Sequence, residues 1–136
     1  MKRNLGYAEI LGIGDENVKY NKYFTGTSYL QRLTTEGLHI SQVTFESGCR
    51  NFWHIHHKGG QILIVTGGHG WYQEEGKEAI ALKEGDVVNI PPEIKHWHGA
   101  SKDSRFSHIC LGVPAKDSSN EWCEPVSDED YMKVGC

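Results

Sequence analysis

The fold is decided by one stretch near the middle of the chain, GCRNFWHIHHKGGQ, which spans residues 48–61. It carries two histidines, His54 and His56, separated by a single residue. On a β-strand, residues i and i+2 point to the same face, so the two imidazoles should project side by side. The glycine pair that follows predicts a turn that returns the chain, and Gln61 then opens the next strand.

A second stretch, GDVVNIPPEIKHWH at residues 85–98, ends in another pair with the same spacing, His96 and His98. A single pair of histidines with this spacing is weak evidence for a metal site, because such pairs also occur on solvated strands. Two such pairs, each at the start of a strand, are stronger evidence for a metal site. If the two hairpins pair, four side chains can converge inside a β-barrel: His54, His56, Gln61 and His96. Three imidazole nitrogens and one amide oxygen would make a site for a first-row metal with open positions.

The rest of the sequence predicts a single all-β domain. A length of 136 residues fits one domain, and 16 glycines and four prolines separate short runs rich in β-branched and aromatic residues. The predicted strands are 26–33, 38–46, 51–56, 61–66, 70–75, 78–82, 86–90, 96–100, 107–111 and 120–125. Ser127 followed by acidic residues predicts a short C-terminal helix. Residues 1–24 show no clean period, and we expect an arm that packs on a partner subunit or on the barrel.

Composition excludes several classes of partner. Lys and Arg number 14 against 18 Asp and Glu, a net charge of −4, and no basic run provides the footprint of a nucleic-acid binder. No apolar stretch approaches the ~20 residues that span a bilayer, and the N-terminus lacks the apolar region of a signal peptide. We therefore expect a cytoplasmic protein with no nucleic-acid or membrane partner, whose cysteines at 49, 110, 123 and 136 are free thiols.

The two histidine stretches match a known pattern. The first, GX5HXHX4QX6G at residues 48–68, resembles the first motif of the cupin superfamily, and GX5PX4H at residues 85–96 resembles the second. The resemblance covers residues 43–111 and implies that residues 1–136 form a single cupin domain. Its fold would be a double-stranded β-helix, a jelly-roll barrel that is usually dimeric.

Three positions depart from the general cupin pattern. Gln61 stands where the fourth ligand is usually Glu, Glu93 replaces a glycine of the second motif, and Ala100 stands where Asn is frequent. Of these, only Gln61 would touch the metal.

A narrower resemblance extends over nearly the whole chain after Tyr23. The segments FTGT (24–27), VTFE (43–46), QILIVT (61–66), GDVV (85–88), KHWHGA (95–100) and DEDY (128–131) are similar to those of bacterial hydroxynitrile-lyase-like cupins. Those enzymes are described as manganese-dependent, and they cleave and form mandelonitrile-type cyanohydrins.

The narrower resemblance implies a set of site residues. The metal ligands would be His54, His56, Gln61 and His96, with His98 and His108 as acid–base residues nearby. The metal would be one divalent transition ion, Mn in the first place, with Fe, Ni or Zn as alternatives. Two features depart from this pattern: the turn before Gln61 is one residue longer, and Gly112 stands where the relatives carry Gln.

A glutamine ligand changes the charge of the site. Three neutral imidazoles and a neutral amide would leave a divalent ion its full charge, which makes it a stronger Lewis acid. This favours polarisation of a hydroxyl or carbonyl oxygen over dioxygen chemistry. We therefore expect a metal-dependent lyase of the hydroxynitrile-lyase type, or related Lewis-acid chemistry, acting on a small molecule.

Three alternatives stay open at this point. The chain could be a metal-dependent dioxygenase similar to quercetinase-like cupins, or a non-catalytic cupin that binds a small ligand. It could also hold no metal, with structural histidines. The apolar residues Ile62 and Ile64 alternate with Leu63 and Val65, and outer faces of this kind need covering. We therefore expect a homodimer.

Overall fold

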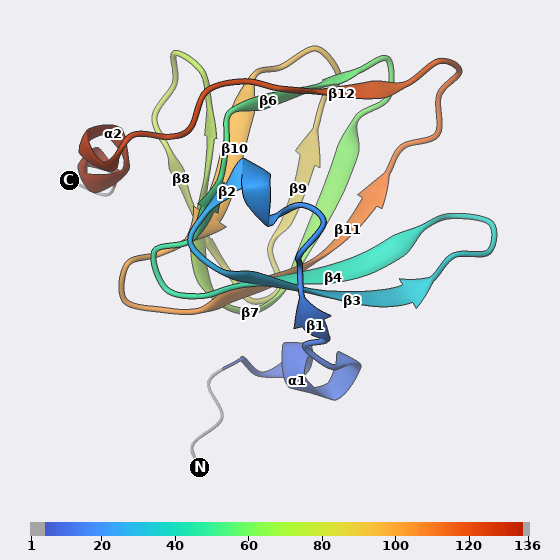
Figure 1. The fold of residues 1–136 in the computed structure, drawn as a ribbon, viewed down its shortest axis with the longest axis horizontal. Coiled ribbons are helices and arrows are strands. Elements are labelled where there is room, and N and C mark those ends of the chain that lie inside the picture. The colour runs from blue at the N-terminus through green and yellow to red at the C-terminus, as the bar shows by residue number, and fades with distance from the viewer. Residues whose placement is uncertain (1–4, 135–136) are drawn as a thin grey trace.

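A computed structural model describes residues 5–134, whose antiparallel strands curl into a barrel (Figure 1). The strands are β1 (Asp15–Glu16), β2 (Phe24–Thr25), β3 (Ser28–Thr34), β4 (Ile40–Phe45), β5 (Arg50–Asn51), β6 (His54–His57), β7 (Gln61–Glu74), β8 (Ile80–Lys83), β9 (Val87–Ile90), β10 (His96–Ala100), β11 (Phe106–Gly112) and β12 (Ser119–Trp122). The helices are α1 (Tyr7–Leu11), the 3-10 turn η1 (Asn21–Tyr23) and α2 (Asp128–Lys133). The predicted all-β jelly-roll fold with a short C-terminal helix is confirmed.

Strand β7 joins the two halves of the barrel. Its first part pairs with β9 and β11, and its second part pairs with β8 and β10. The prediction of two separate strands at 61–66 and 70–75 was wrong, because β7 continues without a break from Gln61 to Glu74. Gly68 has a φ of 74°, and the register with β11 shifts between Ser107 and His108. A bulge of this kind bends a strand without ending it, and glycine adopts the required conformation at no steric cost.

The predicted strand 51–56 is divided in two. Between β5 and β6, the Phe52 N–H donates to the Tyr23 carbonyl, and the Trp53 N–H donates to the Glu124 carbonyl. The chain thus changes partners: β5 pairs with β2 and β10, whereas β6 pairs with β10 and β12. This break places β6 where His54 and His56 face the barrel interior.

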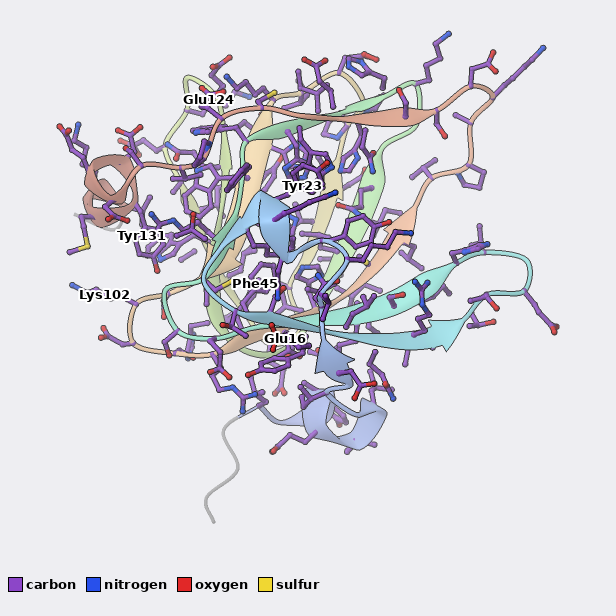
Figure 2. The ribbon with its side chains drawn as sticks, viewed as in Figure 1. Glu16, Tyr23, Phe45, Lys102, Glu124 and Tyr131 are labelled. Carbon is purple, nitrogen blue, oxygen red and sulfur yellow. The ribbon has the colours of Figure 1, made fainter. Side chains whose placement is uncertain are left out.

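The hydrophobic core lies inside the barrel and borders the histidines. Phe45, labelled inside the barrel in Figure 2, is fully buried together with Leu63, Ile90 and Phe106. The Phe45 ring lies 5.7 Å from the ring of His98 and 5.5 Å from that of His108, measured between centroids. The apolar core therefore forms part of the surroundings of the polar site.

The N-terminal segment packs along the outside of the barrel. The Gln42 side chain on β4 is fully buried beneath α1, and its Nε2 donates to the carbonyl oxygens of Ala8 and Gly12 at 2.9 Å each. Residues 1–4 of the predicted arm 1–24, and residues 135–136, lie outside the described residues. Among those described, Cys49, Cys110 and Cys123 are free thiols, and no helix is long and apolar enough to cross a membrane.

A single buried arginine fastens the C-terminal helix to the barrel. Arg50 on β5 is 5% exposed, and its Nη2 donates to the Val126 carbonyl at 2.9 Å and to Asp128 Oδ1 at 2.6 Å. Its guanidinium lies 4.4 Å from the ring centroid of Tyr131, which Figure 2 shows between α2 and the strands. Ser127 caps the helix as predicted, accepting from the Asp130 N–H at 3.1 Å.

Removal of this arginine should loosen the C-terminal helix. We expect Arg50→Ala to lower the free energy of unfolding by about 3 kcal/mol, because buried carbonyl partners lose their donor and Tyr131 loses its packing. Asp128→Asn is the matched control. The Asp128 side chain is 92% exposed, so this change should cost less than about 1 kcal/mol. Urea unfolding of both variants measures their free energies of unfolding. Equal losses of stability in the two variants would contradict the role of Arg50 in holding the C-terminal helix.

Candidate metal centre

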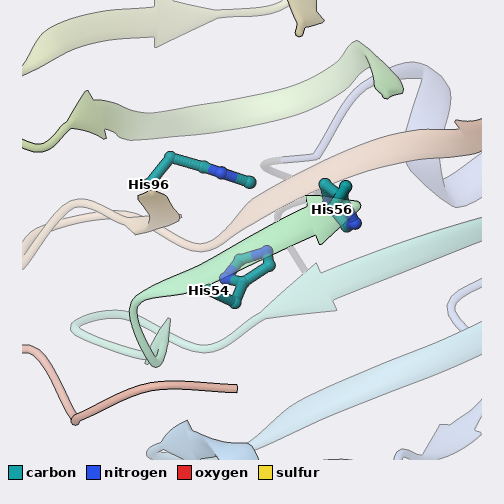
Figure 3. Close-up of side chains that lie close together, drawn as sticks. All are labelled: His54, His56 and His96. Atoms are coloured by element: carbon teal, nitrogen blue, oxygen red, sulfur yellow. The ribbon is translucent and has the colours of Figure 1, made fainter. Parts of the chain in front are cut away.

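Three histidines converge inside the barrel. His54 and His56 project from β6, and His96 on β10 is the cross-strand neighbour of His54. One ring nitrogen from each lies within 4.8 Å of the others, and all three side chains are buried (Figure 3). The structure thus brings together three of the four ligands expected from the sequence.

Hydrogen bonds define the protonation of two of these rings. His54 Nδ1 donates to the Phe52 carbonyl oxygen at 2.7 Å, and His96 Nδ1 donates to the Ile94 carbonyl oxygen at 2.9 Å. Because a carbonyl oxygen only accepts, the proton of each neutral ring must sit on Nδ1. Nε2 then carries the free lone pair that a metal requires.

The third ring is held in a different way. His56 Nδ1 lies 2.6 Å from Asn120 Oδ1, an amide oxygen that accepts its proton. The Nε2 lone pair of the same ring then faces Gln61 Oε1 at 3.2 Å. Two lone pairs at this distance repel one another unless a cation lies near both, so the fourth predicted residue also stands at the site.

The buried donor atoms fit a divalent transition metal. His96 Nε2 is buried and has no hydrogen-bond partner among the described residues, which is costly for a polar atom without a ligand. Burial lowers the pKa of His96 to about 4 and that of His54 well below its usual range, and nearby imidazoles add like-charge repulsion. The rings are therefore neutral near neutral pH, which is the form that binds metals.

A cavity of about 120 Å³ opens beside these ligands. Phe24, Leu30 and Val43 contribute to its apolar wall, whereas His98 and His108 line another part. Of the described residues that line it, none is an Asp, Glu, Lys or Arg. A divalent ion held here would keep its full charge, in keeping with the neutral Gln61.

The two predicted acid–base residues, His98 and His108, line the same cavity as His54 and His56. Their ring centroids are 4.9 Å apart, and burial lowers the pKa of His108 to about 4 and that of His98 well below its usual range. Asn51 accepts from the His98 main-chain N–H at 2.9 Å, so its Nδ2 donates toward His98 Nε2 at 3.1 Å. Neither nitrogen of His108 has a partner among residues 5–134, leaving one donor and one acceptor for a ligand.

Two of the departures from the expected patterns, Glu93 and Gly112, lie beside the turn before Gln61 and beside Gln61 itself. Glu93 has a φ of 69°, a left-handed conformation in which glycine carries no steric cost. Its carboxylate accepts from the main-chain N–H of Lys58 at 3.1 Å and contacts His57 Nδ1 at 2.9 Å, which closes the longer turn. Gly112 pairs with Gln61, and its missing side chain leaves open space beside a recess of about 230 Å³.

Sequence reasoning missed two residues on β12 that contact the predicted metal ligands, and it missed Asn51 beside His98. Asn120 contacts His56, and the ring of Trp122 lies 4.8 Å from that of His54. Trp122 also stacks on Tyr23 with ring centroids 4.4 Å apart. Their i, i+2 spacing in a predicted strand was the available signal, but nothing in the sequence specified that this strand pairs with β6.

Comparisons with known proteins agree with this geometry. The family model described as "Cupin domain" matches residues 41–112. An (R)-mandelonitrile lyase from Granulicella tundricola is 42% identical over 93 residues, which cover 68% of this chain and 70% of that protein. An acireductone dioxygenase from Bacillus pumilus is 28% identical over 81 residues, 57% of this chain and only 43% of that protein. The crystal structure of a cupin-like protein from Thermotoga maritima superposes with a TM-score of 0.85 at 41% identity, covering 93% of this chain and 97% of that one.

The metal centre should bind one equivalent of a divalent transition ion per chain. We expect His96→Gln to weaken the affinity for Mn²⁺ at least about 100-fold, because it removes a buried ligand whose Nε2 has no other partner. His69→Gln is the matched control, since His69 is exposed on β7 and should leave the affinity unchanged. Competition with a chelator measures both variants, and equal affinities would show that the metal binds elsewhere.

Proposed function

Because this chain belongs to the cupin domain family, we propose that it is a metal-dependent lyase of the hydroxynitrile-lyase type, cleaving or forming a cyanohydrin. The metal would be held by His54, His56, Gln61 and His96. The observation that carries the proposal is the pairing of these neutral donors with His108, whose two free nitrogens line the same uncharged cavity. The 42% identity to a protein named (R)-mandelonitrile lyase supports it.

A bound divalent ion would supply Lewis acidity toward the oxygen of the substrate. We propose Mn²⁺ first, and Fe, Ni or Zn as ions to compare. Gln61 adds no negative charge, so the acidity is greater than it would be with a glutamate in its place. The apolar wall that includes Phe24, Leu30 and Val43 would contact the hydrocarbon part of the substrate and exclude water from it.

The histidines of the cavity would handle the proton. The free nitrogen of neutral His108 accepts the proton of the cyanohydrin hydroxyl as the carbon–carbon bond breaks, and the bond electrons leave with cyanide. The His108 imidazolium then returns the proton to cyanide, giving an aldehyde and hydrogen cyanide. His98, whose ring accepts a hydrogen bond from Asn51, packs against His108. It is the second candidate for the residue that accepts the hydroxyl proton.

Racemic mandelonitrile tests this proposal. We expect the Mn-loaded protein to release benzaldehyde, and we expect His108→Gln to lower kcat by about 10²–10⁴-fold without weakening metal binding. The rate should fall as the pH drops below about 4, because protonation removes both the base form of His108 and the metal-binding form of His96, whose pKa values are each about 4. Release no faster than that of a His96→Ala control would reject the lyase.

The second candidate function is a metal-dependent dioxygenase, since two further relatives are named acireductone dioxygenase. Oxygen consumption by the Fe- or Ni-loaded protein with an enediol or flavonol substrate distinguishes it from the lyase. A non-catalytic cupin would bind a small ligand at the metal with no turnover in either assay.

We further propose that the protein is a homodimer. Aliphatic side chains form two rows on the outer face of neighbouring strands: Val87, Ile64 and Ile109 in one row, and Ile62, Leu111 and Ile40 in the other. Next to them, α1 leaves Tyr7 and Ile10 largely exposed. A second copy of the same face is a self-complementary cover for such a surface.

Light scattering should therefore give twice the chain mass of 15.3 kDa. Ile64→Lys should convert the dimer to a monomer, because a charge would be buried at the centre of the interface without a partner. Ile80→Lys is the control, since Ile80 is exposed on β8, outside the two rows. A wild-type mass of one chain would overturn the dimer.

A further inference from the structure

Strand β12 covers the metal centre from outside the part of the chain that the family model matches. It begins at residue 119, beyond the matched residues 41–112, and pairs with β6 (Figure 1). Three of its four residues are exposed. Its inward residues are nevertheless cross-strand neighbours of two ligands, Asn120 opposite His56 and Trp122 opposite His54.

The three ligand histidines differ in the group that accepts the hydrogen bond from Nδ1. For His54 and His96, the Nδ1 proton goes to a main-chain carbonyl two residues earlier, which no side-chain substitution can remove. For His56, it goes to the amide of Asn120, a side chain 64 residues away. The tautomer of one ligand therefore depends on a side chain of a peripheral strand.

A hydrogen bond between His56 and Gln61 could compete with metal binding by these two residues. If the His56 proton moved from Nδ1 to Nε2, it would point at Gln61 Oε1, 3.2 Å away. The resulting hydrogen bond would occupy both ligand atoms, since Nε2 would have no lone pair and Oε1 would already accept a proton. The 2.6 Å contact with Asn120 Oδ1 favours the other tautomer.

We propose that Asn120 is a positioning residue: it keeps the His56 proton on Nδ1 and so prevents His56 and Gln61 from bonding to each other instead of to the metal. This inference rests on the metal site of the proposed function, though not on the reaction. Because coupling is reciprocal, an ion bound by His56 and Gln61 also stabilises the docked position of β12.

Other contacts hold β12 against the barrel independently of this hydrogen bond. Glu121 Oε1 lies 2.7 Å from His57 Nε2 on the outer side, and Trp122 stacks on Tyr23 on the inner side. Substitution of Asn120 should therefore leave the strand folded, so that an effect on the metal can be assigned to the lost hydrogen bond.

Three variants separate positioning from packing. Asn120→Leu keeps the size of the side chain and removes the acceptor, Asn120→Asp keeps an acceptor oxygen, and Ser119→Ala changes the neighbouring residue. Nitrogen-15 spectra of the imidazoles in the metal-free protein report the tautomer of His56. Chelator competition reports Mn²⁺ affinity, and hydrogen exchange reports the protection of residues 119–122 with and without the ion.

We expect Asn120→Leu to shift the His56 proton toward Nε2 and to weaken Mn²⁺ binding about 10–100-fold, the usual cost of losing a partner behind a ligand. Asn120→Asp should restore both properties, and Ser119→Ala should change neither. In the wild type, the ion should slow exchange at residues 119–122.

Each part of the proposal has a result that would overturn it. An unchanged tautomer and affinity in Asn120→Leu, or equal losses in Asn120→Leu and Asn120→Asp, would overturn the positioning role. Exchange at residues 119–122 that is insensitive to the ion would overturn the coupling. Failure of the wild type to bind Mn²⁺, Fe²⁺, Ni²⁺ or Zn²⁺, together with a tautomer shift in Asn120→Leu, would leave the role of Asn120 intact and reject the metal-dependent function.

Discussion

The register between β6 and β10, which sets His96 opposite His54, is the constraint on which the metal centre depends. Side chains alternate between the two faces of a strand, so a slip of one residue would turn these imidazoles out of the barrel. The long strand β7 holds β10 in the sheet, because it pairs with β10 over five residues, and it supplies Gln61 at its start. The bulge between Val65 and Gly67, next to the left-handed Gly68, lets β7 bend from one half of the barrel to the other and pair with strands of both halves.

The same geometry accounts for five buried histidines, a costly content for a small barrel. Burial depresses the pKa of His54, His96, His98 and His108, so they are held as neutral rings rather than as buried charges. At His54, His56 and His96 the Nδ1 proton has an acceptor, which leaves the lone electron pair on Nε2, and Nε2 of His96 is buried with no partner among the described residues. Polar atoms of this kind are rare in cores that serve stability alone, and here they face one cavity.

Much of this arrangement follows from local sequence pattern. The i, i+2 spacing of His54 and His56 and the strand at residues 96–100 gave the face that each imidazole occupies, and the structure places them there. Local pattern cannot describe features that depend on distant pairing. The continuity of β7 through its glycines, the break at Phe52 and Trp53, and the contact between Asn120 and His56 all arise from partners far along the chain. Of these, the contact from β12 bears most directly on the chemistry.

We propose that three imidazole nitrogens and one amide oxygen hold a single cation. Anomalous scattering from a crystal of the Mn-loaded protein, recorded near the manganese edge, locates that cation. We expect one strong peak bounded by Nε2 of His54, His56 and His96 and by Oε1 of Gln61. A peak at the exposed His57, Glu93 and Glu121 instead, with the interior histidines contacting only solvent, would contradict it.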